Sequence, residues 1–380
     1  MRMHFLDTQG KQDTRSMYDS IFKEDSKAFV DYYYQHVVPG NRILAADSQE
    51  QDSRKIQCMI HFNPHMLNIC GNAREAYYLV AVATRPECRK QGIMGRLMEH
   101  ALKEIAKNHM PFTFLMPANP AYYYGQGFSF FPNQPLEKTQ AGDGFGQPEE
   151  KIQEGSSFRK PQEELQDKSS FGRLKRESPV FQWRRARVED TGEIALFANR
   201  ILERQSQIFV QRSKPYYEQL MAETTAEDGA ILLLEISGVL QGILAYGTEQ
   251  NGSGQFMAEI QELLLGDRAK ALFASMSKAA ICQTALPGYG VHFPAFPMMA
   301  RITDLFSLVP LLKSQSPKLY TVDLTDRALP AHNGCFQISL DASGGTITRV
   351  PKTGAEQKLD ISQLFQLLLS GVPVQLTEWV

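Results

Sequence analysis

A run of cationic residues and a glycine stands where a buried strand is predicted to meet a helix. The almost unbroken apolar stretch AYYLVAVAT (76–84) predicts a strand covered on both faces, and Arg85, Arg89, Lys90 and Gly92 follow it. A helix N-terminus offers unpaired N–H groups and the positive end of the helix dipole, and glycine lets the backbone approach an anion closely. The pattern predicts a pyrophosphate site, with a solvated charged turn as the alternative.

The helix that would present this turn is predicted in the next segment, because apolar residues recur there at helical spacing. Ile93, Leu97, Ala101 and Ile105 fall on one stripe, and charged residues fall opposite. The turn lacks both the G-x-G-x-x-G of dinucleotide folds and the G-K-[ST] of phosphate-binding loops. Neither NAD nor ATP is therefore indicated as the ligand.

The turn resembles the acetyl-CoA signature of the GNAT acetyltransferase superfamily, which is R/Q-x-x-G-x-G/A after a strand. Arg89 and Gly92 stand at the expected positions, whereas the sixth position is Met94 and Gly95 comes one step later. Downstream, PFTFLMPANPAYYYGQGFSF (111–130) resembles the strand and loop that end in Tyr-x-x-x-Gly-Phe in this superfamily. The matching residues are Tyr123, Gly127 and Phe128.

The resemblance implies a role for each matched residue. Tyr123 would protonate the departing CoA thiolate, with packing of the loop as the alternative role. Main-chain groups of Val82 and Thr84 would pair with the pantetheine arm of acetyl-CoA. The residues implied to bind the rest of the cofactor are Arg89, Lys90, Gln91, Gly92 and Gly95.

Over its whole length the chain is similar to one GNAT branch, the enhanced intracellular survival (Eis) acetyltransferases. That resemblance implies an α+β (mixed α/β) fold of tandem GNAT-like domains followed by a sterol-carrier-protein-like α+β domain. The expected parts are an acetyl-CoA-binding domain (1–133), a polar linker or insertion (134–179), a degenerate GNAT-like domain (180–296) and the C-terminal domain (297–380).

Several local patterns predict individual elements. Residues 15–36 predict one or two helices broken near 23–26, and RILAAD (42–47) with KIQCMIHF (55–62) predicts a hairpin. Ser237-Gly238 predicts a hairpin turn in the second domain. In the third domain, helices are expected over 302–314 and 360–370.

The end of the chain, PVQLTEWV (373–380), is apolar where chain ends are usually polar and mobile. In the Eis family the terminal carboxylate enters the active site of the first domain, so the resemblance implies that Val380 accepts a proton from the attacking amine. A free α-carboxyl has a pKa of about 3.5, and burial or the nearby Glu378 would raise it. Trp379 and Val374 would anchor the strand.

Phe22 and Asp25 lie on the helical region that borders the acceptor site in GNAT proteins. An aromatic and acidic lining there would suit a cationic acceptor, with solvated helix ends as the alternative. His61 and His65 have no cysteine or carboxylate at ligand spacing, so no metal is expected. Cys88, inside the turn, is expected to be a small turn residue rather than a reactive thiol.

Composition limits the partners. The 380 residues carry 40 Lys+Arg against 42 Asp+Glu, a net charge of −2, which argues against nucleic acid or an anionic membrane as the main partner. Five scattered cysteines form no C-x-x-C pair and no disulfide framework. Neither a leader nor a membrane-length apolar run is evident, so a cytoplasmic location is expected.

Three functions are compatible with these patterns. The first is an acetyl-CoA-dependent N-acetyltransferase acting on a primary amine of a small molecule (aminoglycoside or polyamine-like) or on lysine by direct attack. The second is a catalytically silent acyl-CoA-binding or sensing protein, which Met94 would favour, and the third is a lipid carrier. The family resemblance implies a homo-oligomer, possibly a hexamer.

Overall fold

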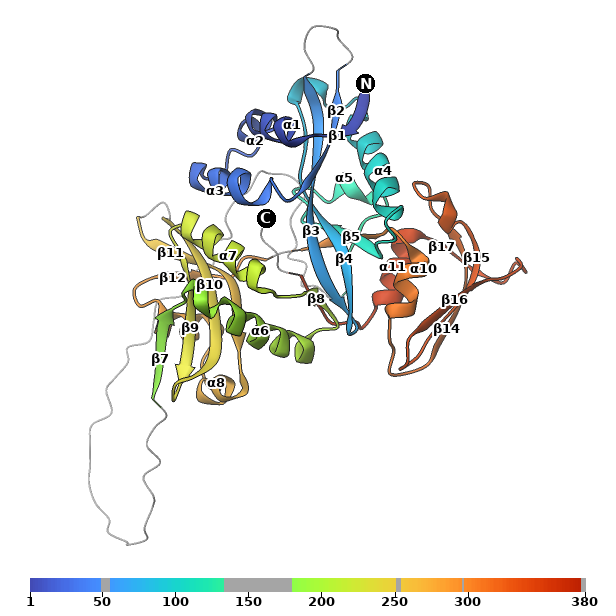
Figure 1. Cartoon of the computed structure of the whole chain (residues 1–380). Coiled ribbons are helices and arrows are strands. Elements are labelled where there is room, and N and C mark those ends of the chain that lie inside the picture. Colours follow the sequence, from blue (N-terminus) through green and yellow to red (C-terminus); the bar gives the residue numbers. More distant parts are fainter. Residues whose placement is uncertain (49–54, 133–179, 251–253, 296, 377–380) are drawn as a thin grey trace, which may run out of the picture.

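The computed structural model describes residues 1–48, 55–132, 180–250, 254–295 and 297–376. These residues form three β-sheets with helices packed on them, so the predicted mixed α+β class is confirmed (Figure 1). Among the described helices, none combines the length and the apolar character needed to cross a membrane.

The first sheet is built from strands that lie far apart in the sequence. Its main path is β1 (Arg2–Phe5), β2 (Arg42–Asp47), β3 (Ile56–Ile69), β4 (Asn72–Thr84), β5 (Phe112–Leu115), β13 (Met299–Ile302) and β6 (Ser129–Phe130). The end of β3 also pairs with β8 (Ile208–Val210), and β8 pairs with β18 (Val374–Gln375). Strands from beyond the polar segment thus complete the N-terminal sheet.

The helices of this part cover the two faces of the sheet. α1 (Thr8–Asp13), α2 (Arg15–Ile21), α3 (Lys27–Tyr32) and the π-helical turn Tyr33–Val37 pack on one face, and α4 (Ile93–Ala106) packs on the other. The predicted break is confirmed, because α3 begins only after Ser26, whose hydroxyl accepts a hydrogen bond from the Phe29 amide at 3.0 Å. The predicted 42–47/55–62 hairpin is also confirmed.

Strands β4 and β5 separate soon after they meet. They run parallel and pair only at Tyr78 and Phe114, so among the described residues the remainder of β4 has no partner strand on that side. On its other side β4 carries a bulge against β3, and Ala81 in the bulge takes the unusual φ of 47°. The point beyond Tyr78 and Phe114, where the two strands are no longer paired, is here called the β4–β5 opening.

The second sheet has the order β12 (Gly290–His292), β11 (Phe256–Leu265), β10 (Val239–Gln250), β9 (Ala230–Ile236) and β7 (Phe181–Arg185). α6 (Thr191–Gln205) and α7 (Lys214–Ala226) contribute to one core on this sheet, and α8 (Asp267–Leu272) and α9 (Lys278–Ala285) contribute to two others. Ser237 and Gly238 both have positive φ, as a tight hairpin turn requires, which confirms the predicted turn.

The third sheet has the order β16 (Gly345–Arg349), β15 (Gly334–Leu340), β14 (Lys318–Thr325) and β17 (Gln357–Asp360), with α11 (Ile361–Leu369) after it. The helix expected over 360–370 is confirmed. The one expected over 302–314 is wrong in length, because β13 takes Ile302, α10 spans only Leu305–Leu308, and a 3-10 turn containing Pro310 follows.

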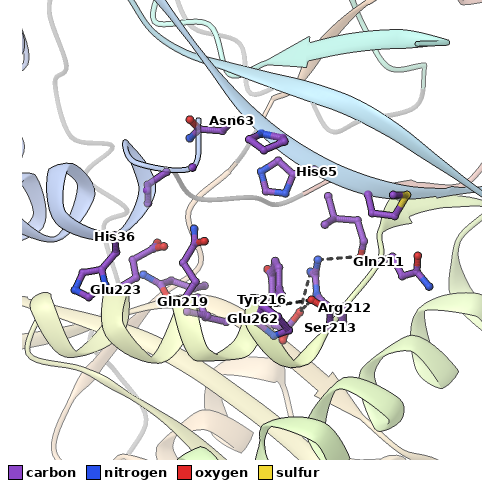
Figure 2. Close-up of a pocket in the computed structure, with 18 residues that line it drawn as sticks. His36, Asn63, His65, Gln211, Arg212, Ser213, Tyr216, Gln219, Glu223 and Glu262 are labelled. Atoms are coloured by element: carbon purple, nitrogen blue, oxygen red, sulfur yellow. Dashed lines mark hydrogen bonds and ion pairs between the residues drawn. The ribbon is translucent and has the colours of Figure 1, made fainter. Parts of the chain in front are cut away.

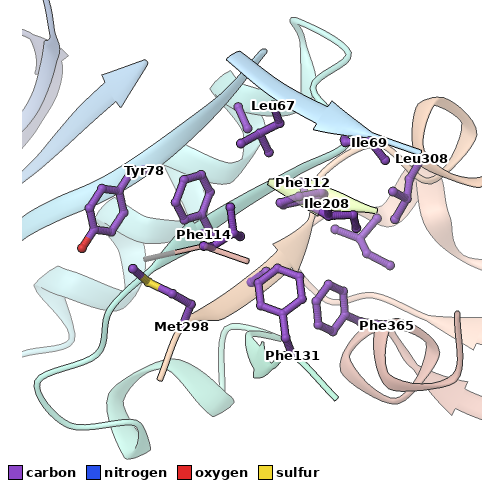
Figure 3. Packing of buried hydrophobic residues seen from close by; sticks show 14 of the residues in the cluster. Leu67, Ile69, Tyr78, Phe112, Phe114, Phe131, Ile208, Met298, Leu308 and Phe365 are labelled. Atoms are coloured by element: carbon purple, nitrogen blue, oxygen red, sulfur yellow. The ribbon is translucent and has the colours of Figure 1, made fainter. Parts of the chain in front are cut away.

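One apolar cluster joins the N-terminal sheet to the C-terminal part. Figure 3 shows Phe131 facing Phe365 of α11, with ring centroids 5.1 Å apart, near Met298 and Ile208. Phe131 comes from the N-terminal part of the chain, Ile208 from the middle part, and Met298 and Phe365 from the C-terminal part. These three parts of the chain therefore share one apolar core.

A buried ion pair fixes the same junction. Arg301 on β13 and Asp326 after β14 are each buried, with Nη2 and Oδ1 2.6 Å apart. Arg301 Nε also donates to the Gln126 carbonyl at 2.9 Å, and His332 Nδ1 lies 2.8 Å from the other oxygen of Asp326. The loop after β5 is therefore held by strand β13 and by the third sheet.

Gly127 in that loop has no room for a side chain. Its φ is +81°, and an added Cβ would lie 2.8 Å from Arg301 Nε and 2.8 Å from Ile361 Cγ2. We predict that Gly127→Ala lowers the free energy of unfolding by about 2–4 kcal/mol, from backbone strain and overpacking. Urea unfolding midpoints measure this change.

Gly125→Ala is the matched control, since its φ is −65° and an added Cβ meets nothing within 4 Å. A similar loss of stability in both variants would contradict the assignment of the cost to the contact with Arg301 and Ile361.

Candidate functional site

The turn between β4 and α4 presents backbone amides to an anion. A 3-10 turn (Pro86–Cys88) is followed by Lys90 with φ 60° and Gly92 with φ 70°, both in the left-handed region. Gly92 immediately precedes α4, and no side chain caps the N-terminus of that helix. The first-turn amides of α4 are therefore available, at the positive end of the helix dipole, to bind a phosphate group.

The side chains of the turn brace it against β4. Arg89 Nε donates to the Thr84 carbonyl and Gln91 Nε2 donates to the Glu87 carbonyl, each at 3.2 Å. Arg89, Lys90 and Gln91 are otherwise exposed. The cations thus stand beside the free amides, as a pyrophosphate site requires.

Val82 and Thr84 lie at the end of β4 that has lost its partner strand. Both are half-buried, and the β4–β5 opening runs alongside them. Thr84 Oγ1 donates to Cys58 Sγ at 3.2 Å, and the Thr84 carbonyl already accepts from Arg89. The strand edge at Val82 is therefore free, among the described residues, for the predicted main-chain contact with a ligand. The Thr84 carbonyl is already occupied by its hydrogen bond from Arg89.

Tyr123 lies in the short helix α5 (Ala121–Tyr124) and is buried among residues of α4 and the first sheet. Its ring packs edge-on against Phe128 at 5.8 Å. Burial, with smaller contributions from Cys58 and Tyr122, raises the pKa of Tyr123 to about 12. The hydroxyl therefore stays protonated at neutral pH and has a proton to donate.

A pocket of about 490 Å³, here called the interdomain pocket, lies between the first and second sheets and their helices. Figure 2 shows Asn63 and His65 of β3 on one side, with Gln219 and Glu223 of α7 on the other. His65 approaches the rings of Tyr78 and Phe114 at 6.1 Å each. Since that pair marks the start of the β4–β5 opening, the pocket and the opening are neighbours.

Polar groups line the far wall of the interdomain pocket. Arg212 and Glu262 form a buried ion pair at 2.9 Å, and Glu223 accepts a hydrogen bond from Tyr32 of α3 at 3.2 Å. Gln261 Oε1 is buried and accepts no hydrogen bond from any residue in the described ranges. The pocket therefore offers carboxylate and amide oxygens to a ligand that donates N–H groups.

His61 sits deep beneath the pocket. It is fully buried, its Nδ1 lies 2.9 Å from the Tyr33 hydroxyl, and burial lowers its pKa to about 3. It is therefore neutral at physiological pH and stacks on Tyr33 as a packing residue. Within the described residues, no group of three His, Cys, Asp or Glu side chains is arranged to hold a metal ion.

Phe22 and Asp25 meet at Tyr18 and lie outside the pocket lining. Phe22 packs on the Tyr18 ring at 4.6 Å, and Asp25 Oδ2 accepts from the Tyr18 hydroxyl at 2.7 Å. Burial raises the pKa of Asp25. Asp25 lies near enough to Glu227, the residue after α7, to raise the pKa of Glu227, and Glu227 Oε2 accepts from Gln261 Nε2 at 2.8 Å.

The sequence analysis did not predict the pocket wall that α7 and the second sheet form. Glu223 lies on α7 and Gln261 on β11, and both meet β3 across about 150 residues or more of chain, which local sequence patterns do not predict. Trp379, Glu378 and Val380 lie outside the described residues.

The Glu227 site makes folding depend on pH. Burial, together with the charges of Glu259 and Asp25, raises the pKa of Glu227 to about 7 from 4.5. The contribution of the Glu227 carboxyl to the free energy of unfolding is therefore fully present below pH 4.5 and is lost as the pH rises through 7. We predict that Glu227→Gln leaves stability unchanged near pH 4 and raises it by up to about 3 kcal/mol at pH 8.

Urea unfolding at the two pH values measures this difference. Glu249→Gln, an exposed change on β10, serves as the control for removing a carboxyl that is not buried. A Glu227→Gln effect of equal size at both pH values would show that its carboxyl does not titrate with the raised pKa.

Comparisons with known proteins agree with this geometry. Residues 7–131 match the family model of the acetyltransferase (GNAT) domain. A search of the curated proteins finds no match. Among solved structures, similar ones are a probable N-acyltransferase from Enterococcus faecalis V583 (TM-score 0.67, 16% identity, 97% of this chain and 89% of that chain) and a GCN5-related N-acetyltransferase from Kribbella flavida (TM-score 0.67, 14% identity, 100% and 98%).

Eis1 from Mycobacterium abscessus is also similar, with a TM-score of 0.62, 12% identity and coverage of 98% of this chain and 90% of that chain. At these identities the likeness is one of fold, and it extends over nearly the whole chain. Residues 7–131 are a GNAT acetyltransferase domain, and by that domain the chain is an acyltransferase that shares its whole-chain fold with Eis1.

Proposed function

We propose that the protein transfers the acetyl group of acetyl-CoA to a primary amine of a small cationic acceptor, of the polyamine or aminoglycoside kind, or to lysine. The observation that carries the proposal is the β4–β5 opening, because β4 leads from it to the uncapped N-terminus of α4, and His65 of the interdomain pocket lies against Tyr78 and Phe114 where it begins. Cofactor and acceptor would meet at the opening.

The cofactor contacts follow from the turn. The pyrophosphate of acetyl-CoA would lie on the α4 amides at Gly92 with Arg89 and Lys90 beside it, and the pantetheine arm would pair with the free edge of β4 at Val82. Gln91 lies in the turn, and Gly95 lies in the first turn of α4. Gly95 already lies against Gln126, whose Nε2 would be 3.2 Å from an added Cβ.

The acceptor contacts follow from the interdomain pocket. An ammonium or amine donates N–H groups, and the pocket wall holds the Glu223 carboxylate and the unpartnered Gln261 Oε1. Glu227 adds a further carboxyl beside Gln261, and Asp25 lies near Glu227, whereas Phe22 contacts only Tyr18 outside the lining. These groups favour a cation over a neutral acceptor.

The chemistry is direct attack of the amine nitrogen on the thioester carbonyl. The C–N bond forms, the C–S bond breaks, and the thiolate of CoA leaves. Tyr123 would donate its proton to the sulfur. A thiol in water has a pKa of about 8.5, so complete proton transfer to a solvated thiolate from Tyr123, with its pKa of about 12, is unfavourable. Burial in the same site also raises the pKa of the thiol, which reduces the difference between the two pKa values.

The carboxylate of Val380 is the proposed acceptor of the amine proton. What supports it is the course of the last described residues: β18 runs parallel to β8, and Leu376 after it is buried. Residues directly after β8 line the interdomain pocket. We further propose that the second domain is a degenerate GNAT-like copy and that the third is sterol-carrier-like.

Release of CoA from acetyl-CoA, followed with a thiol reagent, tests the proposal against polyamines, aminoglycosides, lysine peptides and aromatic amines. We predict release with the cationic aliphatic amines. We also predict that Tyr123→Phe lowers kcat by about 10²-fold with little change in KM for acetyl-CoA, because only the leaving group loses its proton donor.

Tyr122→Phe is the matched control, since Tyr122 is 62% exposed and should retain full activity. Removal of Val380 should lower kcat if its carboxylate is the base. Binding of acetyl-CoA without CoA release in the presence of any of these amines would contradict catalysis and favour the sensing protein instead.

A further inference from the structure

A second pocket, here called the α4 pocket, lies beyond the phosphate-binding turn. Its volume is about 390 Å³, within the usual range for small-molecule sites. One wall is the first two turns of α4, from Gly92 to Glu99, and another is the loop after Tyr123. The third wall belongs to the C-terminal part of the chain, where Arg327 follows β14 and Ile361 begins α11.

The α4 pocket is continuous with the cofactor turn because Gly92 and Gly95 belong to both. From Gly92 to Glu99 the helix rises about 10 Å, at 1.5 Å per residue. A nucleotide whose pyrophosphate rests on the Gly92 turn therefore has room for its nucleoside along α4. The far side of this space is formed by residues of the third sheet region.

The carboxylates of this pocket are already engaged. Glu99 binds Lys103 at 2.7 Å, and Asp326 binds the buried Arg301. Asp360 caps α11 by accepting from the Gln363 amide at 2.9 Å. Glu99 and Asp326 are therefore compensated by cations, and the charge of Asp360 is directed at the N-terminus of α11.

Two arginines remain for a ligand. Arg96 Nη1 donates to the Gln91 carbonyl at 3.2 Å and keeps its charge unpaired within the described residues. Arg327 is exposed and makes no ion pair or hydrogen bond with any residue that the structure describes. An arginine guanidinium matches a phosphate with two parallel hydrogen bonds.

We propose that the α4 pocket holds the phosphorylated adenosine end of coenzyme A and that Arg327, from the third domain, binds its 3′-phosphate. This inference rests on the proposed use of acetyl-CoA. It assigns the C-terminal domain a direct part in cofactor recognition.

The test compares two ligands that differ by one phosphate. Binding of CoA and of 3′-dephospho-CoA is measured by titration calorimetry for the full-length wild-type protein, Arg327→Ala and Arg327→Lys. We expect wild type to bind CoA more tightly than the dephospho form. Arg327→Ala should weaken CoA binding about tenfold and leave 3′-dephospho-CoA unchanged, and Arg327→Lys should restore part of the difference.

Arg268→Ala on α8 is the control, since it removes an exposed arginine far from this pocket and should change neither affinity. Equal weakening of both ligands in Arg327→Ala, or no weakening of either, would overturn the contact with the 3′-phosphate while the wild-type protein still bound CoA. Failure of wild type to bind either ligand would overturn the proposed use of acetyl-CoA and this inference with it.

Discussion

The buried ion pair between Arg301 and Asp326 is the constraint on which the rest of the structure depends. Burial alone would raise the pKa of Asp326, but hydrogen bonds from His332 and Arg301 hold it at about 2, so the carboxylate is charged. Breaking a buried pair leaves an uncompensated charge, which typically costs about 3–5 kcal/mol. Because Arg301 also holds the Gln126 carbonyl, the pair links the third sheet, strand β13 and the loop that carries Tyr123.

The second and third sheet regions contact the N-terminal sheet region at two different pockets. The second sheet and α7 wall the interdomain pocket, where Glu223 and Gln261 supply acceptors for N–H groups. The third sheet region walls the α4 pocket beside the phosphate-binding turn. The β4–β5 opening lies between these two sites, so a reaction that joins an acyl donor to an amine has a place for each reactant. The GNAT domain alone supplies only part of either pocket.

Sequence patterns predicted those parts of the site whose residues are contiguous in the chain. The turn from Arg89 to Gly92, the stripe of α4 and the position of Tyr123 are contiguous in sequence, and the structure places them together. Strands β8, β13 and β18 have two to four residues each, too short for a periodic signal, and they join the sheet through contacts distant in the chain. For the same reason Arg301 could not be recognised as a buried residue from its place in MARITD.

Amide hydrogen exchange of the full-length protein with and without acetyl-CoA tests the central claim most directly, namely that the cofactor lies on the free edge of β4 and the N-terminus of α4. The account predicts that acetyl-CoA slows exchange at Val82 and across residues 89–96, where backbone N–H groups would bind the ligand. Protection confined to the second sheet, or none along β4 and the start of α4 at saturating acetyl-CoA, would contradict it.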